Sequence, residues 1–352
     1  MSLTSDYILI GLTIAFVLSG LFVYIFSDLG KYGTDTNHGP QKIHSGAVPR
    51  IGGLAIFISV IFAALSQSNT TDSLLFLFIA AAIPVFLLGI LEDFTGRVPP
   101  IARLLASLIT GSLFVALTDL ILTTVNVGMI DVLLTHHIIA IPLTILSIAA
   151  LSQAFNIIDG LNGLAGTTAL IIACTFSILL SSASPELMSI CVLLSAAVAG
   201  FLLFNFPIGK IFFGDGGAYF IGAMIAMVAI EAPETNSDLS PFAVLLIVWY
   251  PLYEMVRSAI RRSIKKGKFA FRPDNKHLHS LVFAYIRTRT EFPLTLQNSL
   301  SSLLVMSLPL AASNWAVIFA NDQAALMIGL LLWVCAYEAA MWFVARESRQ
   351  TI

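Results

Sequence analysis

Carboxylates stand at three notable places in an otherwise apolar sequence, and at two of them they adjoin glycines. Asp215 lies among three glycines in FFGDGG, Asp159 opens the run DGLNGLAG, and Glu92 and Asp93 end a long apolar run. Glycines let the backbone turn sharply and approach a ligand closely, and carboxylates supply proton acceptors and oxygen ligands for Mg²⁺. The three segments could therefore form a site, although each could also be an ordinary turn or a solvated helix end.

The acidic residues favour two kinds of chemistry. Glu92 and Asp93 are adjacent, so their mutual repulsion favours proton uptake by one of them, which suits a general base. The same pair could equally hold a hard cation through its oxygens. Asp215 precedes an apolar helix, where backbone N–H groups attract phosphate while the carboxylate holds Mg²⁺. The segment around Asp215 therefore suits a phosphate or metal-phosphate site, with an ordinary glycine-rich turn as the alternative.

Cations, amides and histidines are the remaining candidates for contacts with phosphate, nucleotide or sugar. They are Lys42, His44, Arg50, Arg103, Asn156, Asn162, Lys210, Arg272, His277 and His279. For the cations the alternative is charge at the level of the lipid headgroups, and for the histidine-containing segment it is a solvated loop. Histidines two residues apart are a poor metal pair, and a zinc site would need more ligands than the sequence shows.

Membrane-spanning helices must position these residues. Of the 352 residues, 58% are hydrophobic and only 11% are charged, whereas soluble domains carry about 25% charged residues. The composition predicts an all-α integral membrane protein, a polytopic bundle of helices. No segment is long or polar enough to form a separate soluble domain, so residues 1–352 are expected to form a single transmembrane catalytic domain.

About 20 apolar residues are needed to cross a bilayer. This length gives about eleven candidate spans, with ten as the alternative. They are Tyr7–Phe26, Val48–Leu65, Leu74–Leu91, Ile101–Leu117, Ile138–Phe155, Leu164–Leu180, Leu187–Phe206, Ala218–Ile230, Phe242–Ile260, Leu296–Phe319 and Ala324–Ala345.

The distribution of charge predicts how the spans are oriented. All 18 Lys and Arg residues lie in, or at the edge of, the segments that follow odd-numbered spans, while the segments after even-numbered spans carry acids. The positive-inside rule then places the amino terminus outside and the carboxyl terminus in the cytoplasm. The predicted cytoplasmic loops, residues 27–50, 92–103, 152–163, 207–217 and 261–295, include every candidate residue, which favours one site at the cytoplasmic membrane surface.

Taken together, five ordered motifs resemble the polyprenyl-phosphate N-acetylhexosamine-1-phosphate transferase family, of glycosyltransferase 4 type. They are KIHSGAVPRIGG, LGILEDFTGR, NIIDGLNGLAG, FFGDGGAYFIG and the HLHS loop, and the resemblance extends from about Lys42 to the last span. It implies transfer of a sugar-1-phosphate from a UDP-sugar to undecaprenyl phosphate, with release of UMP and a requirement for Mg²⁺, which Mn²⁺ could replace. It also implies a multi-pass protein of the bacterial inner membrane that initiates O-antigen or another cell-surface polysaccharide.

The resemblance also implies roles for the acidic residues. Asp215 matches the family's metal-binding aspartate. Glu92 and Asp93 match its aspartate pair, proposed to deprotonate or position the lipid phosphate, and the glutamate at the first position makes Asp93 the stronger candidate. Asp159, with Asn156, matches the polar pair near the nucleotide diphosphate.

Other family positions bear on the donor sugar. Asn162 stands where many members carry a second aspartate, and His277 and His279 match the cytoplasmic histidine motif. The chain lacks the three consecutive histidines and the lysine-rich signature of the peptidoglycan branch. A UDP-MurNAc-pentapeptide donor is therefore disfavoured, and UDP-GlcNAc or a 6-deoxy-HexNAc such as FucNAc or QuiNAc is favoured, with the sugar left open.

Two alternative functions predict different residues. A transporter or flippase for a lipid-linked anion would need ionisable residues in the middle of its spans, whereas Glu254 and Glu338 lie near predicted cytoplasmic ends. A CDP-alcohol phosphatidyltransferase would need an Ala-Arg pair and further aspartates after Asp159-Gly160, which do not follow. Membrane lipid is an expected partner, nucleic acid is not, and a homodimer is left open.

Overall fold

A computed structural model of the chain describes residues 3–29, 34–35, 48–66, 73–264 and 276–350. Three predicted substrate contacts, Lys42, His44 and Arg272, lie outside the described residues. The elements are α1 (Leu3–Leu29), β1 (Thr34–Asp35), β2 (Val48–Pro49), α2 (Gly52–Ser66), α3 (Leu74–Thr95), α4 (Pro100–Thr118), α5 (Gly128–Leu134), α6 (His137–Ile158), α7 (Leu164–Leu179), α8 (Pro185–Asn205), α9 (Gly214–Thr235), α10 (Pro241–Ile247), α11 (Trp249–Ile264), α12 (Leu278–Arg289), α13 (Leu294–Ile318) and α14 (Gln323–Gln350).

Each of the eleven predicted spans coincides with a helix, or in one case with two. Eight helices of the described residues are long and apolar enough to cross a membrane, namely α1, α3, α4, α6, α8, α9, α13 and α14. α10 and α11 together would make a ninth span, although the chain bends by 74° between them. α2 and α7 have 15 and 16 residues, fewer than a full crossing needs. The chain is a polytopic helical membrane protein, and the count of eleven spans stays a prediction.

The second predicted span begins later than expected. Val48 and Pro49 form strand β2, antiparallel to β1, and α2 starts only at Gly52. The Pro49 carbonyl accepts the N–H of Phe212 at 2.8 Å, and the Gly52 N–H donates to the Phe212 carbonyl at 3.0 Å. A main-chain connection to the residues before α9 therefore takes the place of a first helical turn, and the all-helical prediction holds apart from this short strand pair.

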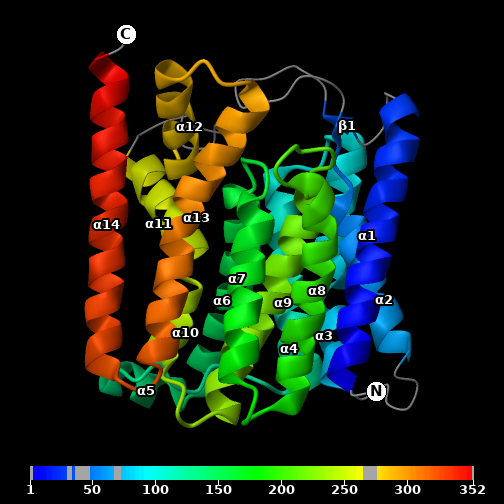
Figure 1. The fold of residues 1–352 in the computed structure, drawn as a ribbon. Coiled ribbons are helices and arrows are strands. Elements are labelled where there is room, and N and C mark those ends of the chain that lie inside the picture. Colours follow the sequence, from blue (N-terminus) through cyan, green and yellow to red (C-terminus); the bar gives the residue numbers. More distant parts are fainter. Residues whose placement is uncertain (1–2, 30–33, 36–47, 67–72, 265–275, 351–352) are drawn as a thin grey trace.

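The helices form one bundle with α9 in its interior (Figure 1). α9 packs against α3 and α6, and also against α2 and α8, and it is buried along most of its length. The two chain ends lie at opposite ends of the bundle, with α12 and β1 at the end where the chain finishes (Figure 1). An odd number of crossings would produce this arrangement.

Pairs of glycines bring α2 and α3 unusually close to the start of α9. A Cβ at Gly53 would lie 2.2 Å from the Cα of Gly217, and a Cβ at Gly89 would lie 2.5 Å from the Cα of Gly216. Small residues let membrane helices approach until their backbones touch. The glycine-rich start of α9 is therefore held between two other helices, which positions the acidic residue within it.

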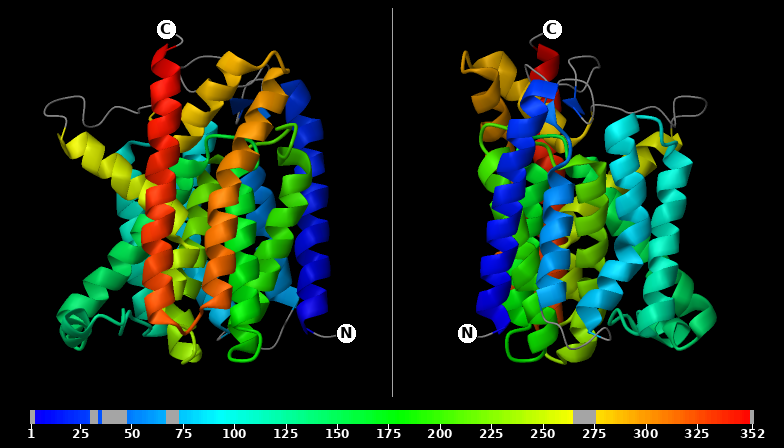
Figure 2. Two further views of the ribbon diagram at one scale, coloured as in Figure 1. Left: turned by 60° about the vertical axis from the view of Figure 1, so that its left-hand side comes forward. Right: turned by 90° about the vertical axis from the view of Figure 1, so that its right-hand side faces the viewer.

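α11, α12 and α14 lie beside the central helices (Figure 1). α11 turns away from the direction of α10 and leans out of the bundle (Figure 2), while α12 packs on α13 and α14. α11 also contacts α6. This group therefore brings the histidine-containing segment before α12 to the carboxyl end of α6, where Asp159 follows.

Candidate active site

Two arginines from separate parts of the chain bind the carboxylate of Asp215. Arg103, in the first turn of α4, donates from Nη1 to Oδ2 at 2.7 Å, and Arg50, just before α2, donates from Nη2 to Oδ1 at 3.1 Å. Asp215 is buried, whereas the side chain of Arg50 is 36% exposed and that of Arg103 is 20% exposed. Both guanidinium groups thus join a buried carboxylate to the surface, where they can meet an anionic substrate.

Asp93 holds the start of α9. Its Oδ1 accepts the N–H of Asp215 at 2.8 Å, and its Oδ2 accepts the N–H of Gly216 at 2.9 Å. A carboxylate at a helix amino terminus also interacts favourably with the helix dipole, and Arg50 Nε lies 3.7 Å from Oδ1. The sequence suggested that backbone N–H groups at this helix start bind phosphate, but those of Asp215 and Gly216 are bonded to Asp93. Asp93 organises the position of Asp215, and its role as a base stays a prediction.

Gly214 shows why the motif needs its first glycine. Its φ is +77°, in the left-handed region that glycine adopts without strain. A Cβ there would lie 2.1 Å from the carbonyl oxygen of Arg50 and 2.6 Å from Oδ2 of Asp93. No other residue fits between the two, so this glycine is what allows α3 and the residues before α2 to meet at α9.

Asp159 adds a third carboxyl group near Asp215 and Arg50. It follows α6, is half-buried, and lies near enough to the backbone of Gly214 for that group to affect its pKa. Burial raises the pKa of Asp159 to about 7, the charge of Arg50 opposes this rise, and the charge of Asp215 adds to it. Asp159 therefore changes protonation state near neutral pH, unlike an ordinary aspartate.

Glu92 has a different position from Asp93. Its Oε2 accepts the N–H of Val98 at 2.7 Å, so the side chain stabilises the turn between α3 and α4. The same turn leads to Arg103 in α4, which is close enough to feel the charge of Glu92. These contacts favour a supporting role for Glu92, and the choice of Asp93 as the stronger candidate of the pair stays a prediction.

The donor groups fit a magnesium ion that is shared with a substrate. Mg²⁺ is usually bound by one or two carboxylates together with substrate phosphates and water. Asp215 and Asp159 are near enough for their charges to interact, while the described residues contain no group of three or more His, Cys, Asp or Glu side chains that could enclose a metal. An ion here would therefore take part of its coordination from phosphate oxygens.

The predicted histidines lie together next to the Asp159 loop. His277 precedes α12 and His279 is in its first turn, both are buried, and their rings are parallel to within 4°, with centroids 5.4 Å apart. The ring of His279 is so close to Gly160 that a Cβ there would lie 2.4 Å from Nε2. The structure thus brings this histidine motif to the residue that follows Asp159.

Residues 75–232 match the sequence profile of glycosyl transferase family 4. A Thermotoga maritima protein named "Undecaprenyl-phosphate alpha-N-acetylglucosaminyl 1-phosphate transferase" is 30% identical over 239 residues, which cover 68% of this chain and 69% of that protein. The chain belongs to glycosyl transferase family 4.

Other relatives of this family 4 transferase have similar names. A Bacillus subtilis protein named "Probable undecaprenyl-phosphate N-acetylglucosaminyl 1-phosphate transferase" is 29% identical over 287 residues, 80% of this chain and 79% of that protein. A Mycobacterium tuberculosis protein named "Decaprenyl-phosphate N-acetylglucosaminephosphotransferase" is 28% identical over 269 residues, 68% of this chain and 66% of that protein. The resemblance inferred from the motifs is confirmed, and membership of a transferase family decides against a transporter.

The remaining predicted residues of the family 4 transferase lie around the cluster or support it. Asn156 is half-buried in the last turn of α6, and Lys210 is exposed in the loop before α9. Asn162 is buried: its N–H donates to Asn298 Oδ1 at 2.8 Å, and its side-chain amide donates to the Pro207 carbonyl at 3.3 Å. The contacts of Asn162 are thus internal to the protein and hold the loop that follows Asp159.

Two polar residues of the site were not predicted. Arg103 also interacts with the side chain of Tyr219, one turn after Asp215, and the carbonyl of Arg103 accepts from Gln153 Nε2 at 3.3 Å. The four-residue spacing from Asp215 to Tyr219 places both on one face of α9, which was the available signal for Tyr219. Gln153 lies in the polar stretch around Asp159, but only the structure shows that it contacts α4.

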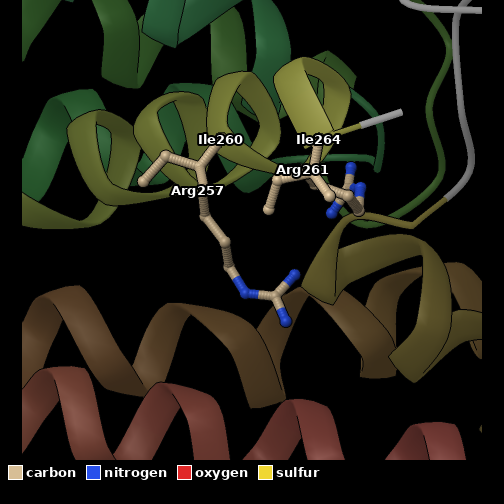
Figure 3. Close-up of a pocket in the computed structure, with 4 residues that line it drawn as sticks. All are labelled: Arg257, Ile260, Arg261 and Ile264. Carbon is tan, nitrogen blue, oxygen red and sulfur yellow. The ribbon is translucent and has the colours of Figure 1, made fainter. Parts of the chain in front are cut away.

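α11 carries an open pocket of about 350 Å³ that is separate from this cluster. Its lining residues, Arg257, Ile260, Arg261 and Ile264, all lie on one helix (Figure 3). Arg257 also donates from Nε to Glu338 Oε1 of α14 at 2.6 Å. Guanidinium groups beside aliphatic side chains are suited to the boundary between lipid tails and headgroups.

Proposed function

We propose that this chain transfers N-acetylglucosamine 1-phosphate from UDP-N-acetylglucosamine to a polyprenyl phosphate, and so begins the synthesis of a lipid-linked glycan. One observation carries the assignment: Asp93, Asp159 and Asp215 meet Arg50 and Arg103 at a single surface site. Carboxylates that can hold a metal, next to arginines that can bind phosphate, suit phosphoryl transfer between two anionic partners. The names of the relatives support this donor and acceptor.

The reaction exchanges one phosphoanhydride bond for another. An oxygen of the polyprenyl phosphate attacks the phosphorus that carries the sugar, the bond from this phosphorus to the bridging oxygen breaks, and UMP leaves with that oxygen. Because charge collects on the phosphate oxygens during transfer, the protein acts mainly by positioning and by neutralising charge. No oxidant or further reactant is required.

Each residue of the cluster has a part in this scheme. Asp215, with Asp159 nearby, would hold Mg²⁺, and the bound ion would neutralise charge on the diphosphate. Arg50 and Arg103 bind phosphate oxygens, since each guanidinium presents several fixed N–H groups. Asp93 keeps Asp215 in place through the amides of α9, and it is the candidate to accept a proton from the acceptor phosphate. Mn²⁺ would suit the same oxygen ligands.

We place the site at the cytoplasmic face of a bacterial inner membrane. The distribution of Lys and Arg supports this orientation, with the amino terminus outside and the carboxyl terminus inside. A polyprenyl acceptor dissolved in the bilayer and a soluble nucleotide sugar can meet only at the membrane surface. Homodimerisation is not required by the scheme and stays a prediction.

A turnover assay tests the proposal. The purified protein would be incubated with undecaprenyl phosphate, Mg²⁺ and each of UDP-GlcNAc, UDP-GalNAc, UDP-QuiNAc and UDP-FucNAc, and release of UMP would be measured. The expected result is release with UDP-GlcNAc that depends on both the lipid and the metal. Release with a 6-deoxy sugar alone would move the assignment to that donor, and no release with any of them would overturn the function.

A further inference from the structure

A carboxylate buried between α11 and α14 is unusual for a membrane helix. Glu254, in α11, has no exposed surface, and a buried carboxylate is costly unless its oxygens are hydrogen-bonded. Both oxygens of Glu254 have partners: Oε2 accepts the hydroxyl of Tyr337 at 2.6 Å, and Oε1 lies 2.8 Å from Nδ1 of His277. The three residues come from three separate elements, so this arrangement fixes α14, α11 and the start of α12 to one another.

The bond from Glu254 determines how the histidine pair is oriented. A carboxylate that accepts from Nδ1 of a histidine fixes both the plane of the ring and the nitrogen that carries the proton. The ring of His279 lies parallel to that of His277, is 4% exposed, and packs with Nε2 against Gly160. Its Nδ1 is buried and has no hydrogen-bond partner in the part of the chain that the structure describes.

His279 therefore depends on packing for its position. Burial lowers the pKa of His279 to about 4, with the nearby His277 adding to the effect and Glu254 opposing it, so the ring is neutral at pH 7. A neutral ring with an unpaired buried nitrogen gains little from its own polar contacts. The neighbouring His277, held by Glu254, and the backbone of Gly160 are what keep the ring in place.

We propose that Glu254 and Tyr337 are positioning residues of this enzyme: they hold the pair His277 and His279 against Gly160 and so fix the Asp159 loop in its place beside Asp215. The inference rests on the proposed function, because it assigns a role within that site. It makes the last helix, α14, part of the machinery that shapes the site, because Tyr337 of α14 binds Glu254. Tyr337 and Glu254 touch no substrate in this scheme.

Two tyrosines offer a matched test. Tyr337 donates to Glu254, and Tyr253, in α11, donates to Glu338 of α14 at 2.9 Å. Both hydroxyls therefore bond a glutamate across the same pair of helices, but among the described residues only Glu254 binds a histidine. Tyr337→Phe is expected to lower kcat/KM for the UDP-sugar about tenfold, because it leaves a buried acceptor without its donor, while Tyr253→Phe stays within about twofold of the unaltered protein. Equal losses in the two variants would overturn the proposal.

A double-mutant cycle separates positioning from general stability. If the hydroxyl of Tyr337 acts through the histidines, Tyr337→Phe should change kcat/KM by less than about twofold in a protein that already carries His279→Ala. The same tenfold loss in both backgrounds would mean that Tyr337 acts independently of His279, and the proposal would fail. Glu254→Gln, which keeps the size of the side chain, should show the same dependence on His279.

Chemical modification of His279 tests the positioning role of Tyr337 without measuring turnover. Diethyl pyrocarbonate modifies accessible neutral histidines, and mass spectrometry can follow the modification of His279. The buried ring should react slowly in the unaltered protein and in Tyr253→Phe, and at least about fivefold faster in Tyr337→Phe. Unchanged protection in Tyr337→Phe would overturn the positioning role, whereas failure of the unaltered protein to release UMP would count against the proposed function alone.

Discussion

Replacing Gly89 with alanine would test how strongly activity depends on the spacing between α3 and α9. A Cβ at this residue would lie 2.5 Å from the Cα of Gly216 and 2.6 Å from its nitrogen. Ordinary van der Waals contact begins at 3.4 Å, so the two helices would have to separate by about 0.9 Å, the difference between 3.4 and 2.5 Å. The obstructing atoms belong to the backbone and cannot rotate away.

This displacement would act directly on the site. Asp93 follows Gly89 by one helical turn and binds the N–H groups of Asp215 and Gly216 at 2.8 and 2.9 Å. Moving α3 away by about 0.9 Å would take these bonds beyond the usual hydrogen-bond distance and would shift Asp215 relative to its arginines. Because a misplacement of about 1 Å can reduce a rate by about 100-fold, Gly89→Ala is expected to lower kcat/KM by about that factor.

The assay needs a control for stability. Overpacking commonly costs about 1–3 kcal/mol of folding free energy, so thermal unfolding in detergent would accompany the measurement of UMP release. Gly128→Ala, at the start of α5, is the matched substitution, since a Cβ there meets nothing within 4 Å. The reasoning would be refuted by a Gly89→Ala protein that unfolds at the same temperature as Gly128→Ala and turns over within about twofold of it.

Three further predictions concern charged residues. Asp215→Asn should abolish Mg²⁺-dependent release of UMP, and near-normal turnover would remove Asp215 as the metal ligand. Burial raises the pKa of Asp159 to about 7, so kcat/KM should rise as pH increases through 7, and Asp159→Asn should flatten this rise; an unchanged profile would assign it to another group. The same shift makes the folded state bind this proton more tightly than the unfolded state, so the carboxyl group's contribution to stability falls as pH rises from about 4 to about 7. Arg103→Gln should lower kcat/KM about 100-fold, whereas Arg97→Gln, at an exposed position, should stay within about twofold; equal losses would point to a general effect of positive charge.

The helices and the individual polar clusters could be predicted from the sequence because both depend on local pattern. Continuous apolar runs of about 20 residues have few alternatives to a spanning helix, and a carboxylate among glycines is conspicuous in such a chain. The start of α2 was misplaced, since the apolar run through Val48 gives no sign that Pro49 bonds to Phe212. That bond depends on residues 163 positions apart in the chain (212 − 49).

The connections between clusters could not be predicted. Asp93 was expected to act as a base or to hold a cation, but its bonds to the amides of α9 depend on the close contact of Gly89 with Gly216. Glu254 was taken only as an acid near the end of a span, because a single glutamate there usually faces water. Its partner Tyr337 lies 83 residues further along, and an apolar helix such as α14 gives no signal that one of its tyrosines has a polar partner.

The interior position of α9 has a consequence for how the protein is made. Asp93, Arg103 and Asp159 leave the ribosome before α9 does, but the amides that pair with Asp93 belong to Asp215 and Gly216 at the beginning of α9. Until α9 is inserted between α3 and α6, Asp93 lacks the two amides that bind it and Arg103 lacks its carboxylate partner, Asp215. We expect a nascent chain arrested before α9 to be a substrate for membrane quality control, and the insertion of α9 to be the step that makes the bundle resistant to it.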